Sequence, residues 1–85
     1  MGTLVAKVQR QKIRDFREAI RALQDTGNAP DGWVRSWVPL NDPPETINET
    51  TANFLLVEGE PMYITGDARP TGKYGCIVPV LRRDS

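Results

Sequence analysis

The chain has 85 residues with 11 basic and 11 acidic side chains, so its formal net charge at pH 7 is zero. This length allows one small domain, and a domain of this size buries roughly 60–65% of its unfolded surface, which makes independent folding marginal. The sequence has no histidine and one cysteine, which removes the usual residues of metal sites, internal disulfides and most acid–base catalysis.

The sequence favours a cytoplasmic location without membrane association. No run approaches 18 consecutive apolar residues, and the N-terminus lacks the apolar core of a secretory signal. Cys76 lies alone between Gly75 and Ile77, a setting typical of a buried small hydrophobic residue rather than of a reactive thiol.

The first third of the chain has the pattern of one amphipathic helix. Its apolar residues recur three or four positions apart and share one helical face. They are Ile13, Phe16, Ile20 and Leu23. Gly27 is a typical C-terminal stop, and we therefore predict a helix over about residues 9–26. The segment 3–8 alternates well enough to be a strand, and the alternative of an earlier helix start stays open.

The rest of the chain indicates an irregular β-rich region, because residues 28–85 hold all seven prolines and five of the seven glycines. We predict a strand over 33–40, a hairpin with arms 54–58 and 62–65 around a Gly59-Glu60 turn, and a last strand over 76–81. Residues 41–53 and 66–75 are expected to be loops. Pro79 has no amide hydrogen, so we expect it to confine the last strand to a sheet edge or a bulge.

These elements predict an α+β fold in a single small domain over residues 1–85. One N-terminal amphipathic helix would pack on a small three- to four-stranded antiparallel sheet. Residues 66–74 resemble a phosphate-binding loop in composition, but the spacing of their glycines and the presence of Tyr74 in place of serine or threonine exclude that motif. We therefore expect no cofactor.

The clearest functional feature is an arginine ridge on the helix. It consists of Arg10, Arg14, Arg17 and Arg21. At spacings of four, three and four these residues share one face opposite the apolar stripe, and arginine forms bidentate pairs with carboxylates and phosphates. The ridge is therefore predicted to dock on an acidic protein surface or on a phosphate backbone. The alternative is a solvated face, supported by pairs that Glu18 makes with Arg14 and Arg21.

The charges are unevenly spread along the chain. Residues 1–26 carry six basic and three acidic groups, residues 27–60 carry one and six, and residues 61–85 carry four and two. A further alternative follows, in which the acidic segment 42–60 packs back on the ridge within the same chain.

A second candidate site is the strand with two tryptophans. In a strand Trp33, Arg35 and Trp37 share one face, and Val34, Ser36 and Val38 share the other. Tryptophan and arginine are common anchors of protein interfaces and can also stack on bases. We expect one indole to fill the core under the helix and do not expect both to be buried.

The sequence therefore predicts a small protein without catalytic residues, such as an accessory or inhibitor protein. It would dock on a larger protein or assembly through the arginine ridge and the tryptophan strand. Its predicted partner-binding residues are Arg10, Arg14, Arg17, Arg21, Trp33, Arg35 and Trp37. The alternatives are a nucleic-acid-binding protein that uses the same arginine helix, and a self-assembling structural subunit or homo-oligomer.

Overall fold

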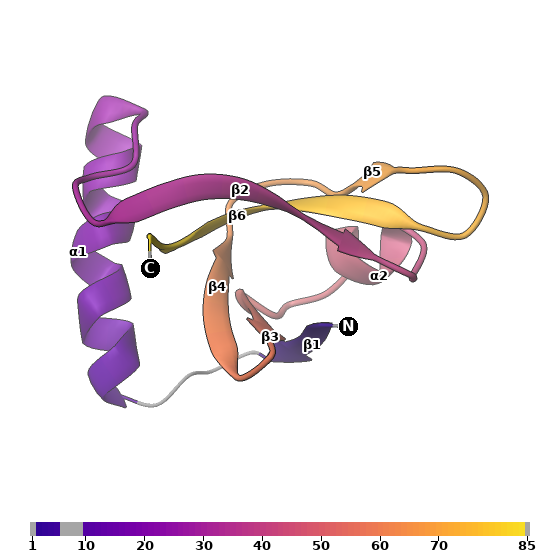
Figure 1. Cartoon of the computed structure of the whole chain (residues 1–85), viewed down its shortest axis with the longest axis horizontal. Coiled ribbons are helices and arrows are strands. Elements are labelled where there is room, and N and C mark those ends of the chain that lie inside the picture. The colour runs from indigo at the N-terminus through magenta and orange to yellow at the C-terminus, as the bar shows by residue number, and fades with distance from the viewer. Residues whose placement is uncertain (1, 6–9, 85) are drawn as a thin grey trace.

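The computed structural model describes residues 2–5 and 10–84 and confirms the α+β class (Figure 1). One long helix, α1 (Arg10–Thr26), packs against an antiparallel sheet. Its strands are β1 (Gly2–Val5), β2 (Trp33–Leu40), β3 (Phe54–Val57), β4 (Glu60–Ile64), β5 (Arg69–Pro70) and β6 (Cys76–Arg83), and a short helix, α2 (Glu45–Asn48), precedes β3. The strand order is β1-β3-β4-β6-β2, with β5 paired to β6, so the described sheet has six strands rather than three or four.

The N-terminal segment begins as a strand. Up to Val5 this decides for the strand and against an earlier start of the helix. Gly2–Val5 pairs with β3, with Leu4 opposite Leu55. Residues 6–9 lie outside the described residues. Strand β2 begins and ends where the sequence predicts, and α1 ends at the predicted Thr26.

The prediction that Pro79 restricts the last strand to an edge or a bulge is wrong, because β6 lies inside the sheet. It pairs with β2 along its whole length, and on its other side with β5 at residues 76–77 and β4 at residues 80–81. Pro79 therefore faces the gap between the β4 and β5 ladders. Its carbonyl accepts a hydrogen bond of 2.9 Å from the amide of Thr65, and no ladder bond needs the missing amide hydrogen.

The predicted β3–β4 hairpin is present, but its turn lies one residue earlier than expected. Val57 pairs with Glu60, so the two central residues are Glu58 and Gly59. Both have positive φ, 52° and 81°, and a two-residue turn with both angles positive matches the right-handed twist of the flanking strands. Glu58 therefore takes a left-handed conformation in this turn, where asparagine, aspartate or glycine is usual.

Both predicted loops contain short regular elements. Helix α2 interrupts the loop at 41–53, and its buried Ile47 joins the core, while β5 lies within residues 66–75. The side chain of Asn48 links the two segments, because its Oδ1 accepts a 2.7 Å hydrogen bond from the amide of Ala68. Neither element is long enough to give a periodic sequence pattern.

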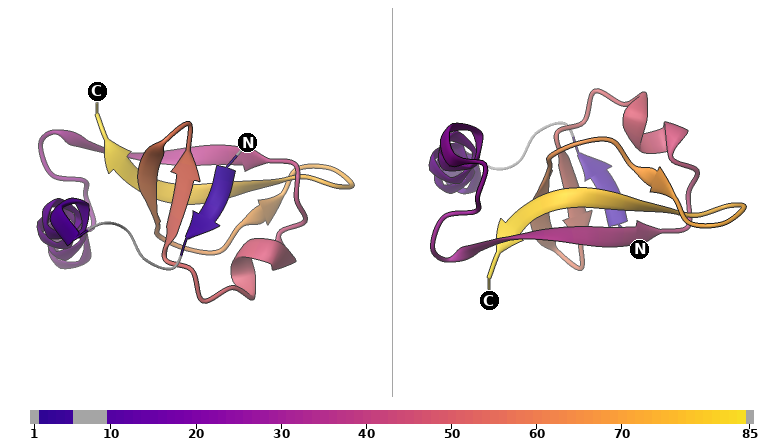
Figure 2. Two further views of the ribbon diagram at one scale, coloured as in Figure 1. Left: turned by 90° about the horizontal axis from the view of Figure 1, so that it is seen from below. Right: turned by 90° about the horizontal axis from the view of Figure 1, so that it is seen from above.

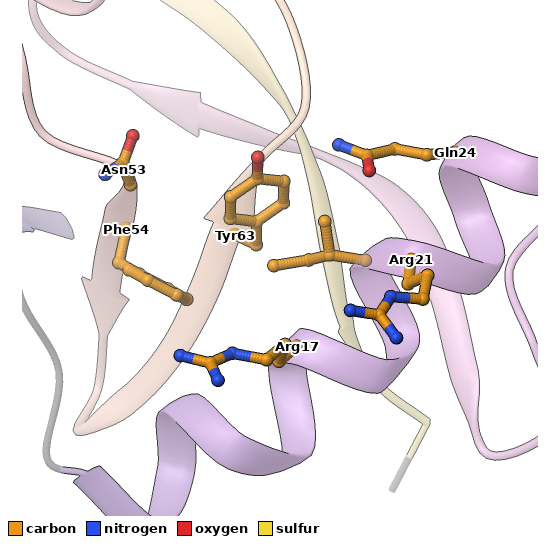
Figure 3. Close-up of a pocket in the computed structure, with 7 residues that line it drawn as sticks. Arg17, Arg21, Gln24, Asn53, Phe54 and Tyr63 are labelled. Carbon is orange, nitrogen blue, oxygen red and sulfur yellow. The ribbon is translucent and has the colours of Figure 1, made fainter.

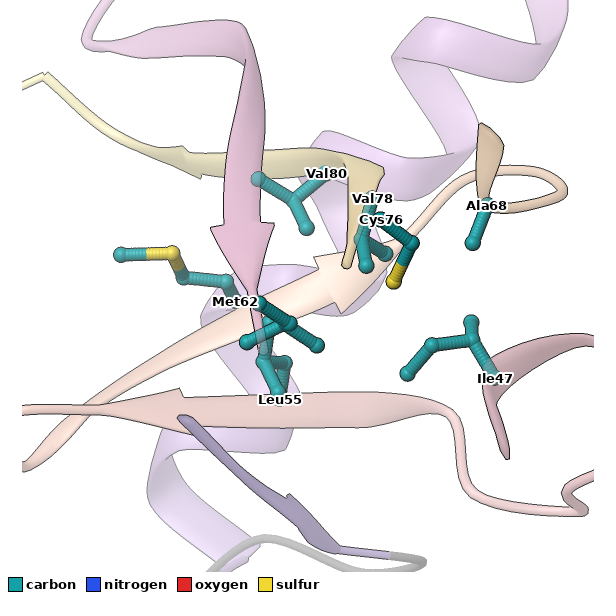
Figure 4. Close-up of a cluster of buried hydrophobic side chains, with 8 residues drawn as sticks. Ile47, Leu55, Met62, Ala68, Cys76, Val78 and Val80 are labelled. Carbon is teal, nitrogen blue, oxygen red and sulfur yellow. The ribbon is translucent and has the colours of Figure 1, made fainter. Parts of the chain in front are cut away.

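The sheet buries apolar side chains on both faces. In Figure 2, β3 and β4 cross β2 and β6 at a steep angle, so the sheet is strongly twisted. One face encloses the core cluster shown in Figure 4. Its buried members are Leu40, Ile47, Leu55, Met62, Ala68, Cys76, Val78 and Val80. Cys76 is fully buried there, which confirms its predicted role as a small hydrophobic residue.

The other face carries α1 through a row of aromatic rings. Phe16 is 4% exposed and meets Trp33 edge-to-face at 4.7 Å and Phe54 at 5.1 Å between ring centroids. Phe54 continues the row to its cross-strand partner Tyr63 at 5.6 Å. Because α1 lies across only one end of β2 and β6 (Figure 1), the rest of this face stays open. A groove lies beside the contact between α1 and the sheet.

Candidate functional site

Three of the four predicted ridge residues have side chains that the structure describes. Arg14, Arg17 and Arg21 are exposed on α1, and the side chain of Arg10 lies outside the described part of the chain. No Asp or Glu side chain of the described residues lies within 4 Å of these three guanidinium groups. The ion pair on this helix instead joins Asp15 to Arg83 of β6. The predicted pairs with Glu18 are therefore not formed.

The acidic side chains of segment 42–60 do not pair with the ridge either, although Asn53 and Phe54 of this segment line a pocket together with Arg17 and Arg21. Helix α2, which lies in the middle of segment 42–60, is at the opposite end of the sheet from α1 in both views of Figure 2. The described residues give no ion pair between this segment and the arginines of α1. The arginine face is therefore open to a ligand outside the chain.

The two tryptophans have different environments, as expected. Trp33 is half-buried between Phe16 and the guanidinium of Arg83, which lies 4.8 Å from its ring centroid. Trp37 is 48% exposed and has the guanidinium of Arg69 at 5.3 Å. Trp33 is thus a structural residue, and Trp37 is the indole available to a partner.

Two ridge arginines line a pocket between the helix and the sheet, which we call the arginine pocket. It has a volume of about 510 Å³. Its lining residues are Arg17, Ile20, Arg21 and Gln24 from α1, Asn53 just before β3, Phe54 at the start of β3, and Tyr63 from β4. Figure 3 shows the two guanidinium groups on the helix side and the ring of Tyr63 facing them from the sheet.

The arginine pocket continues into two further hollows. The middle hollow, of about 280 Å³, shares Ile20, Gln24 and Tyr63 with the arginine pocket and adds Arg35. The third hollow, of about 230 Å³, shares Arg35 with the middle one and reaches Trp37. We call the three together the groove. It brings four of the seven predicted site residues, from two separate elements, onto one continuous surface.

The polar groups of the arginine pocket are nearly all hydrogen-bond donors or amides. The structure describes no hydrogen bond from the side chains of Arg17, Arg21 or Gln24 to any other described residue. Arg35, farther along, gives one weak bond of 3.4 Å from Nη1 to the carbonyl of Gly27 at the end of α1. Among the described residues no carboxylate lines the pocket, so the arrangement favours binding of an anion.

The sequence analysis did not identify Tyr63, Asn53 or Gln24 as site residues. Tyr63 and Asn53 come from the hairpin, about 40 residues after the ridge, and only tertiary packing brings them beside α1. Gln24 lies seven residues after Arg17, two helical turns along the same face, and this spacing was the one available signal.

Comparisons with protein-family models, curated proteins and solved structures found no match to this chain. Among residues 2–5 and 10–84, no three cysteine or acidic side chains come together as a metal site would require. Within the same residues, no helix is both long and apolar enough to cross a membrane. The groove is therefore the feature from which a function must be argued.

Proposed function

We propose that this chain is a non-catalytic binding protein that docks on a larger protein by accepting an acidic segment of that partner in the groove. The observation that carries the proposal is the convergence of Arg17, Arg21 and Arg35 on one surface without a carboxylate partner among the described residues. Such a protein would act as an accessory or inhibitor protein by occupying its partner's acidic surface.

Charge complementarity supports an acidic protein segment as the occupant. Each guanidinium presents a planar fork of donors that matches a carboxylate, and each such charge-assisted bond contributes about 1.5–3 kcal/mol. Trp37 adds an exposed indole at the far end of the groove, and tryptophan is among the residues that most often anchor protein interfaces. The groove therefore combines the two residue types that dominate interface energetics.

Binding of a fluorescein-labelled Glu-Gly repeat peptide of twelve residues tests the proposal, with the Gln-Gly peptide of equal length as the uncharged control. Reversing one charge, as Arg17→Glu or Arg21→Glu, is expected to weaken binding at least about tenfold. Arg14→Glu is the matched control, because Arg14 is exposed on the same helix but does not line the groove. An equal loss with Arg14→Glu would mean that the peptide responds to overall charge, and the groove would then not be the site.

A pull-down connects the peptide result to a natural partner. We expect a protein that stays bound to the tagged chain after nuclease treatment, is released by the Glu-Gly peptide, and is lost with the Arg17→Glu/Arg21→Glu variant but retained with Arg14→Glu. Retention of the same protein by the double variant would show that it binds elsewhere and would contradict the proposal.

A nucleic-acid single strand is the second candidate, favoured by the alternation of cationic and aromatic groups along the groove. Arg21, Tyr63, Arg35 and Trp37 follow one another from the arginine pocket to the third hollow. This alternation is typical of surfaces that track a backbone while bases stack on aromatic rings. It predicts binding of a dT12 oligonucleotide with a slope of log K against log salt near about −2 for three phosphate contacts. A complex resistant to nuclease, without measurable dT12 binding, would reject this candidate.

A further inference from the structure

The arginine pocket has more unused positive charge than one carboxylate requires. Arg17 and Arg21 are one helical turn apart, so their side chains lie next to each other on α1. Both are without an acidic partner among the described residues, and Figure 3 shows both guanidinium groups at the same pocket. A ligand group that pairs with both guanidinium groups balances their charge fully only if it carries about two negative charges.

A phosphate monoester meets this requirement better than a carboxylate does. It carries a charge of about −1.5 to −2 at pH 7 and three terminal oxygens, whereas a carboxylate carries one charge and two oxygens. Clusters of arginine are a general means of recognising phosphorylated side chains, because each fork can bind two phosphate oxygens. The charge and geometry of Arg17 and Arg21 therefore point to a phosphate group.

The size and walls of the pocket indicate what carries the phosphate. Its volume of about 510 Å³ is in the range of small-molecule sites and exceeds the needs of a phosphate alone. Ile20 and the rings of Phe54 and Tyr63 form an apolar wall beside the guanidinium groups. Phe54 is fixed between Phe16 and Tyr63 at 5.1 and 5.6 Å, so this wall is formed before a ligand binds.

We propose that the arginine pocket binds a phosphate monoester attached to a planar aromatic group, and that a phosphorylated tyrosine anchors the partner's acidic segment there. The phosphate binds Arg17 and Arg21, and the ring packs against Ile20 and Tyr63. This inference rests on the proposed function, since it names the anchor residue of the same docking segment. A mononucleotide offers the same chemistry in free form.

The experiment titrates the full chain with four related probes and follows the side-chain signals of Arg21, Gln24 and Asn53 by nuclear magnetic resonance. The probes are the peptide Gly-Glu-Glu-phosphotyrosine-Gly-Glu, its unphosphorylated form, phenyl phosphate and AMP. We expect the phosphopeptide to bind at least about tenfold more tightly than the unphosphorylated peptide. This preference should disappear in Arg17→Gln/Arg21→Gln and persist in the control Arg14→Gln, with far-UV circular dichroism confirming the fold of each variant.

The pH dependence of phenyl phosphate binding gives an independent readout. The second pKa of a phosphate monoester is about 6, and the chain has no histidine. The titratable groups that face the phosphate are Arg17 and Arg21 from α1 and Tyr63 from β4. Affinity for phenyl phosphate should therefore rise several-fold between pH 5 and 7.5, about threefold or more, as the second proton leaves the ligand.

Each remaining outcome is decisive. Equal affinity for the two peptides, with loss of both in Arg17→Gln/Arg21→Gln, would refute the phosphate anchor and leave the proposed function intact. Failure of both peptides to bind would refute both. Inorganic phosphate, titrated as a fifth probe, would exclude a role for the aromatic wall if it bound as tightly as phenyl phosphate. Tighter binding of AMP than of the phosphopeptide would support the phosphate chemistry but overturn the assignment to a partner's tyrosine.

Discussion

Replacing Phe16 by alanine tests the packing on which the whole site depends. Phe16 is 4% exposed and contacts the rings of Trp33 and Phe54 at 4.7 and 5.1 Å. Truncating a buried phenylalanine to alanine costs about 3–5 kcal/mol, and this figure already includes the two aromatic contacts of about 0.5–1.5 kcal/mol each. We expect the free energy of unfolding to fall by about 4 kcal/mol. A domain of 85 residues has a total of roughly 4–13 kcal/mol.

Urea denaturation followed by circular dichroism and tryptophan fluorescence measures this loss. Trp33 contacts Phe16 directly, so its fluorescence should change even where the sheet survives and only α1 detaches. Tyr74→Ala is the control, because Tyr74 is 72% exposed and its removal should change stability by less than about 0.5 kcal/mol. A loss below about 1 kcal/mol for Phe16→Ala would show that the aromatic row does not hold the helix to the sheet, and the groove between them would lose its structural basis.

Three further predictions concern single interactions elsewhere in the fold. The ion pair between Asp15 and Arg83 spans 2.9 Å with both side chains more than half exposed, so Asp15→Asn should cost less than about 1 kcal/mol and less still in high salt; a larger loss in urea denaturation would contradict this. Gly27 ends α1 at φ 77° with open space where a side chain would lie, so Gly27→Ala should cost about 1–2 kcal/mol through backbone strain alone, and a neutral effect on the thermal midpoint would disprove it. Burial, with smaller effects of nearby carboxylates, raises the pKa of the Cys76 thiol. The thiolate therefore forms at lower pH in the unfolded chain than in the folded chain. The contribution of Cys76 to the free energy of unfolding is fully present below about pH 8.5 and is lost as the pH rises toward the folded pKa. Above about pH 9 the free energy of unfolding should fall more steeply for the wild type than for Cys76→Ala, and parallel curves would refute this reasoning.

Elements whose hydrophobic pattern repeats over many residues could be predicted from the sequence. The amphipathic stripe of α1 and the alternation in β2 gave their bounds to within a residue, because each pattern repeats over at least eight positions. Helix α2 and strand β5 are too short for any period to appear. The interior position of β6 could not be predicted from Pro79, because it depends on where the ladders of two other strands end.

The candidate site could likewise be predicted only in part. The arginines could be predicted, because their spacing is a local property of one helix, and the exposure of a single indole followed from the half-buried strand. The pocket that the arginines form together with the sheet could not be predicted. It requires Phe54 and Tyr63 beside α1, where the ring of Phe16 packs on Phe54 and the ring of Phe54 packs on Tyr63. Long-range packing, not composition, thus converts a charged helix face into a pocket.

The zero net charge of the chain limits how the groove can attract a partner. A neutral molecule exerts little attraction beyond the Debye length, which is about 8–10 Å at physiological salt. The acidic residues Glu45 and Glu49 lie around α2, at the far end of the sheet from α1 (Figure 2), while α1 itself also carries Asp15, Glu18 and Asp25. An acidic segment would therefore be oriented toward Arg17 and Arg21 only on close approach. Charge reversal at these residues should consequently act mainly on the dissociation rate, through lost charge-assisted bonds, and less on the association rate.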